Sequence, residues 1–162
     1  MNYAFTKGKI LDGTKDMQVQ TGLCILVQDG TITDIVPDTA DLSGYETIDL
    51  QGRYIMPGLI NMHVHLAGNG KPQKKQRDNE KLVKKIMRSS LTRAVAYKMV
   101  SDFAKDELLS GVTTIRTVGG LGSFDTRLRD EIAAGTKVGP RILAANEGIS
   151  VLGLSLIHIS EP

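Results

Sequence analysis

The stretch that decides the fold is residues 57–66, which read Pro57-Gly58-Leu59-Ile60-Asn61-Met62-His63-Val64-His65-Leu66. From Leu59 onward the run is mostly apolar and has strand length, a pattern typical of a strand buried on both faces in a parallel sheet. Alternate side chains of a strand point to one face, so His63 and His65 are predicted to project together, with Met62 and Val64 packing on the other side. Two neutral imidazoles on one face can bind one divalent ion such as Zn²⁺. Taken alone, the pair is also compatible with surface or core histidines.

The segments that follow alternate between helix and strand. A long helix is predicted from Asn79 to Ser110, ended by Gly111. Its apolar residues recur at three- and four-residue spacing and form one face, made of Leu82, Val83, Ile86, Met87, Leu91, Ala94, Val95, Met99 and Phe103. Strands are predicted at Val112 to Val118 and Arg141 to Ala145, with a helix near Thr126 to Ala134 between them. This order predicts βαβ units and a parallel sheet.

The segment before Pro57 has a different sequence pattern. Residues 1–56 contain several short apolar runs separated by turn residues, which predicts a small all-β unit. Asp29-Gly30 is a strong hairpin signal between candidate strands at Leu23 to Gln28 and Thr31 to Val36. Cys24, the only cysteine, lies in the first of these strands, so it is predicted to be a buried inert thiol rather than a reactive one.

Composition excludes several classes of function. A chain of 162 residues with 41% hydrophobic and 23% charged residues can form a globular core. The formal net charge of +2 is too small to indicate a nucleic-acid partner. Neither a signal peptide nor a membrane span is visible, so a cytoplasmic location without membrane association is expected. The basic stretch from Lys71 to Lys85 is interpreted as a solvated loop and helix start, the alternative being attraction of an anionic substrate.

Four tracts together carry a resemblance to a known family: residues 57–65, Gly111-Val112-Thr113-Thr114-Ile115-Arg116, Leu128-Arg129-Asp130-Glu131-Ile132-Ala133-Ala134-Gly135 and Gly139-Pro140-Arg141-Ile142-Leu143. In this order they resemble the amidohydrolase superfamily, in the branch of imidazolonepropionase-like enzymes and Xaa-Pro dipeptidases. The resemblance covers nearly all of residues 1–153. It implies an α/β fold, a partial metal-dependent hydrolase (β/α)8 TIM barrel over residues 57–153, preceded by a small β-sandwich over residues 1–56.

The resemblance also implies a chemistry. Family members hold one or two divalent ions, usually zinc, at the barrel mouth, and His63 and His65 match the first two ligands. A carboxylated lysine or a glutamate, two further histidines and a late aspartate complete the family's site. Metal-activated water then hydrolyses C–N bonds of a small-molecule amide, cyclic amide or dipeptide-like substrate. We therefore expect an N-terminal fragment, inactive by itself and without catalytic residues of its own. The complete enzyme is compatible with a homo-oligomer, and the sequence leaves its oligomeric state open.

Other interpretations stay open at this point. The chain is alternatively a non-catalytic binding or scaffold module, or part of a related phosphotriester or lactone hydrolase. Arg116 is interpreted as a structural ion-pair partner, with a substrate carboxylate as the alternative. Thr117 stands where related sequences often have an aspartate. Glu147 follows the third barrel strand on the expected rim of the site, and the glycines Gly119, Gly120 and Gly122 are interpreted as a tight turn rather than a phosphate loop.

The last nine residues, Leu154 to Pro162, read Leu-Ser-Leu-Ile-His-Ile-Ser-Glu-Pro. They resemble the translation of a transposase adapter used in preparing sequencing libraries. We interpret residues 154–162 as a non-native tail and exclude His158 from the candidate ligands.

Overall fold

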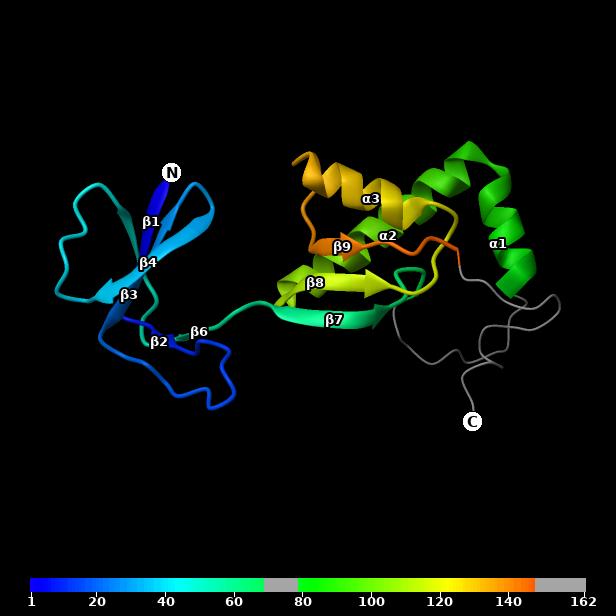
Figure 1. The fold of residues 1–162 in the computed structure, drawn as a ribbon. Helices are drawn as coiled ribbons and strands as arrows, with labels where there is room; N and C mark the ends of the chain where they lie inside the picture. The colour runs from blue at the N-terminus through cyan, green and yellow to red at the C-terminus, as the bar shows by residue number, and fades with distance from the viewer. Residues whose placement is uncertain (69–78, 148–162) are drawn as a thin grey trace. The chain divides into compact units, whose positions relative to one another are not determined.

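The computed structural model describes residues 1–68 and 79–147 (Figure 1). The chain divides into two compact units, Met1–Pro57 and Gly58–Pro162. The tail predicted over residues 154–162, with His158, lies outside the described residues. So does the part of the basic stretch between Lys71 and Asp78.

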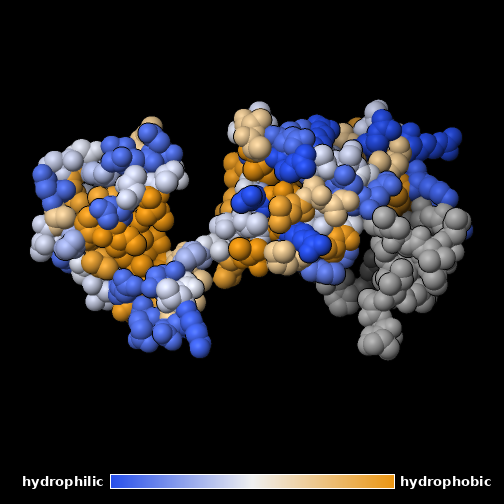
Figure 2. Space-filling model, viewed as in Figure 1, coloured by the Kyte–Doolittle hydropathy of each residue, from blue (hydrophilic) through white to orange (hydrophobic). Residues whose placement is uncertain are grey.

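The Met1–Pro57 unit is built from six strands in two sheets. The larger sheet has the order β4-β3-β1-β5, and a two-stranded sheet pairs β2 with β6. The bounds are β1 Asn2–Thr6, β2 Lys9–Ile10, β3 Leu23–Gln28, β4 Thr31–Pro37, β5 Glu46–Asp49 and β6 Tyr54–Ile55. The buried hydrophobic residues of this unit are Ala4, Ile10, Cys24, Ile25 and Leu26. Figure 2 shows further hydrophobic residues gathered on the visible face of this unit.

The predicted hairpin between β3 and β4 is confirmed. Asp29 and Gly30 both have positive φ, 48° and 80°, as a two-residue type I′ turn requires. The turn places Gln28 opposite Thr31 and Cys24 opposite Val36. Cys24 is 1% exposed, and burial raises the pKa of its thiol, which fits the predicted inert cysteine.

The Gly58–Pro162 unit has the predicted βαβ order. Its three parallel strands are arranged β7-β8-β9, and helices α2 and α3 pack against them. The bounds are β7 Leu59–Val64, α1 Asn79–Arg88, α2 Ser90–Leu109, β8 Val112–Thr117, α3 Phe124–Ala133 and β9 Arg141–Leu143. In the part of the chain that the structure describes, no helix is long and apolar enough to cross a membrane.

One core cluster lies between this sheet and its helices. The strands contribute Val64, Ile115 and Ile142, while the helices and loops contribute Leu66, Ala96, Tyr97, Val100, Ala104, Leu121, Phe124 and Leu128. Tyr97 also ties α2 to α3, because its hydroxyl donates to Glu131 Oε2 at 2.6 Å. The guanidinium carbon of Arg127 lies 4.0 Å from the centroid of the same ring.

The prediction of one long helix over Asn79 to Ser110 is wrong, since the helix is broken at Ser89. Ser89 has extended dihedral angles (φ −113°, ψ 141°) and precedes the first residue of α2. The carbonyls at the end of α1 find side-chain donors in the next helix: Thr92 Oγ1 donates to Ile86 O and Arg93 Nη1 donates to Met87 O. These bonds satisfy helix-end carbonyls that the break leaves unpaired.

The apolar face predicted for this segment is also wrong in α2. The residues that α2 buries are Ala96, Tyr97, Val100, Ser101 and Ala104. The predicted face instead leaves Leu91 72% exposed and Val95 65% exposed. The helix is apolar on more than one side, so periodicity alone does not identify the side that contacts the sheet.

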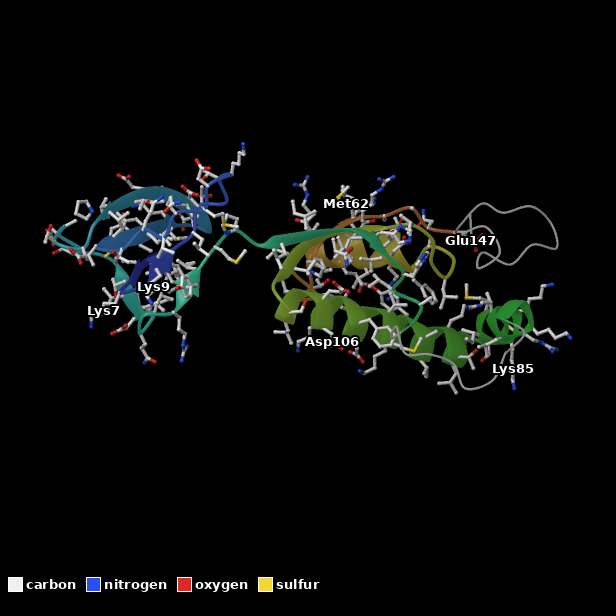
Figure 3. All side chains as sticks on the ribbon, turned by 90° about the horizontal axis from the view of Figure 1, so that it is seen from below. Lys7, Lys9, Met62, Lys85, Asp106 and Glu147 are labelled. Carbon is white, nitrogen blue, oxygen red and sulfur yellow. The ribbon has the colours of Figure 1, made fainter. Side chains whose placement is uncertain are left out.

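The expectation that β7 is buried on both faces is wrong for this chain as well. Strand β7 lies at the edge of the three-stranded sheet, and Leu59, Ile60 and Met62 are each at least half exposed. Only Val64 reaches the core, whereas Met62 was expected to pack beside it. Figure 3 shows Met62 on the side of the sheet away from α2. The register with β8 shifts between Asn61 and Val64, which breaks the simple alternation of sides.

Candidate metal centre

The structure brings His63 and His65 together at the carboxyl end of β7. His63 is the next-to-last residue of the strand and His65 follows its end. Their ring centroids lie 5.2 Å apart, with an angle of 74° between the ring planes. Both side chains are exposed rather than packed in the core. The two imidazoles therefore project into the same space, despite the register shift within the strand.

A backbone carbonyl orients the ring of His65. Its Nδ1 lies 3.1 Å from the carbonyl oxygen of Gly119. Because a carbonyl oxygen only accepts hydrogen bonds, this contact requires the proton on Nδ1. The lone pair of a neutral ring is then on Nε2, free to bind a metal. Such a bond from the non-ligating nitrogen is the usual support of metal-bound histidines.

The ring of His63 is held differently. Its backbone N–H donates to Asn61 Oδ1 at 3.2 Å, a local bond that fixes the chain just before the ring. Among residues 1–68 and 79–147, no hydrogen bond engages the His63 ring itself. The donor set is thus two imidazole rings, whose nitrogen atoms suit Zn²⁺ and other borderline divalent ions. Within the same residues, no group of three His, Cys, Asp or Glu side chains is placed to hold a metal ion.

A buried polar network lies behind the loop that carries Gly119, and sequence reasoning missed it. Asp125, 3% exposed, accepts from Thr117 Oγ1 at 2.6 Å and from the N–H of Asn146 at 2.8 Å. The Thr117 hydroxyl in turn accepts from the N–H of Ala145 at 2.9 Å. The network joins the end of β8, the start of α3 and the segment after β9. An aspartate in the first turn of a helix was the only sequence signal for it.

Two further residues have defined positions near this end of the sheet. Arg116 pairs in register with Leu143 of β9 and is exposed. The ion-pair partner expected for Arg116 is not found in the described part of the chain. Glu147 follows β9 (Figure 3), and its Oε1 lies 3.9 Å from the point where a Cβ on Gly122 would be. Its side chain therefore lies over the β8–α3 loop.

The glycines of that loop form a turn, as predicted. Gly119 has φ 145° and Gly122 has φ 57°, both in the region that favours glycine. The carbonyl that contacts His65 thus belongs to a residue whose conformation a larger side chain would strain.

Comparison with known proteins gives consistent matches. The Amidohydrolase family model matches residues 46–118. A dihydroorotase from Trichlorobacter lovleyi is 37% identical over 70 residues, which are 43% of this chain and 16% of that protein. An imidazolonepropionase from Salmonella paratyphi A is 34% identical over 113 residues, covering 60% of this chain and 28% of the relative.

Solved structures match over a longer part of the chain. A Xaa-Pro dipeptidase with bound methionine in its active site has a TM-score of 0.71 and 27% identity, covering 97% of this chain and 38% of that one. A molinate hydrolase has a TM-score of 0.67 and 27% identity, covering 89% of this chain and 29% of that structure. The chain thus spans well under half the length of each of these relatives.

Proposed function

We propose that this chain is the N-terminal part of a metal-dependent enzyme of the amidohydrolase superfamily, which hydrolyses C–N bonds; the family model and the relatives support this assignment. The observation that carries the proposal is the pair His63 and His65, with ring centroids 5.2 Å apart at the carboxyl end of β7. In (β/α)8 barrels the active site is built at this end of the strands.

The expected fold class is confirmed. The chain is mixed α/β, and its superposition on the Xaa-Pro dipeptidase covers 97% of its residues. It is a partial barrel of three parallel strands, preceded by a small β unit. A complete barrel takes about 250 residues, so the chain contains only its first βα units.

In the proposed site, Nε2 of His65 and a ring nitrogen of His63 are two ligands of a divalent ion, which we propose to be zinc. When bound there, such an ion would lower the pKa of a bound water toward neutrality and would act as a Lewis acid on the scissile carbonyl. The Gly119 carbonyl keeps the His65 proton on Nδ1 and so keeps Nε2 available. Structural zinc usually has four ligands, so we infer that further ligands and the proton-transferring group lie in parts of the fold that this chain does not contain.

For the substrate we propose a small molecule with an amide, cyclic amide or dipeptide-like C–N bond. The names of the relatives support this class, since a dihydroorotase, an imidazolonepropionase and a Xaa-Pro dipeptidase are all among them. Arg116 is exposed on β8 without an ion-pair partner among the described residues, and we propose that it contacts an anionic group of the substrate.

Zinc titration of the chain and of three histidine variants tests the proposal. The sequence has three histidines, so His158→Asn is a matched control for His63→Asn and His65→Asn. Calorimetry is expected to show a zinc-binding event that His63→Asn and His65→Asn each weaken at least about tenfold. His158→Asn is expected to leave it unchanged. Binding that depends on His158 alone, or no binding at all, would refute the pair as ligands.

A second experiment addresses the whole enzyme. Sequencing the source gene through codon 153 is expected to reveal a lysine or glutamate, two separated histidines and a late aspartate in the continuing frame. Metal analysis of that longer protein, with hydrolysis of amide substrates, then tests the activity. A stop codon after codon 162 in the source gene would instead favour a non-catalytic binding module.

A further inference from the structure

We propose that Thr117 and Asp125 form a buried brace that positions His65 for metal binding, by holding the Gly119 carbonyl against its Nδ1. Its consequence for metal binding rests on the proposed function, while the positioning itself does not. Thr117 and Asp125 are positioning residues, because neither contacts the His65 ring directly.

The brace closes the loop that carries the carbonyl. Strand β8 ends at Thr117, the loop runs through Gly119, and α3 begins at Phe124. The hydrogen bond from Thr117 Oγ1 to Asp125 Oδ2, 2.6 Å long, therefore joins the two ends of the loop. Thr117 and Asp125 are 1% and 3% exposed, so water does not compete easily for this bond.

The loop is also attached to β7 next to the histidines. The N–H of Val118 donates to the carbonyl of Val64 at 3.2 Å, between His63 and His65 in the sequence. One residue further along, the carbonyl of Gly119 reaches His65 Nδ1 at 3.1 Å. With its start attached to β7 and its two ends joined by the brace, the loop has little freedom to move the Gly119 oxygen away.

The segment after β9 supports the brace from the other side. The Ala145 N–H donates to Thr117 Oγ1, and the Asn146 N–H donates to Asp125 Oδ2. Asn146 has φ 60°, and its carbonyl oxygen lies 3.6 Å from where a Cβ on Gly120 would be. The loops after β8 and β9 are therefore held as one piece around the buried carboxylate.

A purely structural role for the brace would lower stability without changing the His65 ring. The proposal makes a different prediction, because loss of the brace lets the Gly119 carbonyl move. The His65 proton should then redistribute from Nδ1 toward Nε2, the nitrogen that an unsupported neutral imidazole prefers to protonate. The tautomer of His65 is thus a readout that stability alone does not move.

The test is a long-range proton–nitrogen correlation spectrum of the isotope-labelled chain, recorded well above the ordinary imidazole pKa of about 6.5. Only three histidines need assignment, and a His158→Gln spectrum removes one. In the parent chain, His65 is expected as the Nδ1–H tautomer. Thr117→Val, which keeps the shape but loses the hydroxyl, should shift His65 toward Nε2–H. Thr117→Ser keeps the hydroxyl and should preserve the parent tautomer.

Thr113→Val is the matched control, because Thr113 lies on the same strand but has no bond to Asp125. It should leave the His65 tautomer unchanged. If Thr117→Val does not fold, Asp125→Asn decides in the same way, since its amide replaces one acceptor oxygen by a donor. An Nε2–H tautomer of His65 in the parent chain, or an unchanged Nδ1–H tautomer in a folded brace variant, overturns the proposal.

Zinc titration of the same variants separates this inference from the proposed function. Thr117→Val is expected to weaken zinc binding about tenfold or more, the usual effect of losing support behind a ligand, whereas Thr113→Val is not. If the parent chain keeps the Nδ1–H tautomer but binds no zinc, the proposed function fails and the positioning of His65 stands. If zinc binds but Thr117→Val changes neither tautomer nor affinity, the positioning fails and the proposed function stands.

Discussion

Replacing Asp125 by alanine should destabilise the Gly58–Pro162 unit by about 2–4 kcal/mol. The carboxylate, 3% exposed, accepts from Thr117 Oγ1, from the Asn146 N–H and from the Thr126 N–H at 2.6–2.9 Å. Each buried polar group left without a partner costs roughly 1–3 kcal/mol. In the variant the Thr117 hydroxyl can still donate to Leu143 O, 3.4 Å away, so it costs less free energy than the N–H groups left without an acceptor. Relief from burying the charge offsets part of the total.

Urea unfolding followed by helical ellipticity measures this loss. All helices in the described part of the chain belong to the Gly58–Pro162 unit, so the signal reports that unit. With a slope of about 1.5 kcal/mol per molar urea, a loss of 3 kcal/mol lowers the midpoint by about 2 M. The control is Asp130→Ala on the same helix, whose side chain is 63% exposed and pairs only with Arg129 at the surface. Its effect should stay below about 0.5 kcal/mol. Equal midpoints for the two variants would refute the reasoning about the buried network.

Three further results are expected. Leu128 is fully buried in α3, so Leu128→Ala should lower stability by about 3 kcal/mol in the same assay, and a loss below about 1 kcal/mol would contradict the core assignment. A Cβ on Gly58 would lie 2.1 Å from Thr113 Oγ1, so Gly58→Ala should destabilise the pairing of β7 with β8. Adding Thr113→Gly removes the clash and should restore much of the lost stability, and a double variant without this rescue would contradict the clash as the cause. Burial of the Tyr97 ring, and then its hydrogen bond to Glu131, raise the pKa of the phenol from 10.0 to about 12. The stability that the protonated phenol contributes should therefore be complete below pH 10 and should be lost as the pH rises toward 12. Phenolate absorbance should show a late-titrating group that Tyr97→Phe removes, and an unchanged titration curve in that variant would contradict this assignment.

The sequence predicts best the elements that are determined by residues within the element itself. The Asp29-Gly30 turn follows from two residues that accept positive φ, and β8 follows from a run rich in β-branched residues and ended by glycines. The predicted helix near Thr126 to Ala134 is α3, which starts two residues earlier at Phe124. Boundaries move by a few residues because caps and frayed ends depend on the surroundings of each element.

The wrong predictions concern which side of a helix or strand is buried. The helical spacing of Leu91 and Val95 predicts that they lie in the core, yet the buried side of α2 is the one with Ala96 and Ala104. Small residues let a helix approach a sheet closely, and the spacing of apolar residues does not take side-chain size into account. Likewise, the pattern of β7 predicts burial on both faces, but burial also needs a neighbour on each face, and a local pattern does not supply one.

The candidate site was predictable in part for the same reason. His63 and His65 are two residues apart, so strand geometry brings their rings together even with a register shift in between. Gly119 lies 54 residues from His65, and only the parallel pairing of β7 with β8 makes its carbonyl a partner of the ring. No local pattern connects these two positions, so the tautomer-fixing contact required the tertiary structure.

The hydroxyl of Thr117 has a structural role that the sequence alone does not reveal. The resemblance implies an aspartate at this position, and the sequence alone leaves the role of Thr117 open. In the structure the Thr117 hydroxyl faces the buried carboxylate of Asp125, whose Oδ2 lies 2.6 Å away. An aspartate at both positions would place two carboxylates in one buried space, where like charges strongly disfavour joint ionisation. A hydroxyl at 117 avoids this conflict, because it donates to the carboxylate and accepts from Ala145 at the same time. Thr117 and Asp125 are therefore best understood as one hydrogen-bonded unit, in which the hydroxyl donates to the carboxylate.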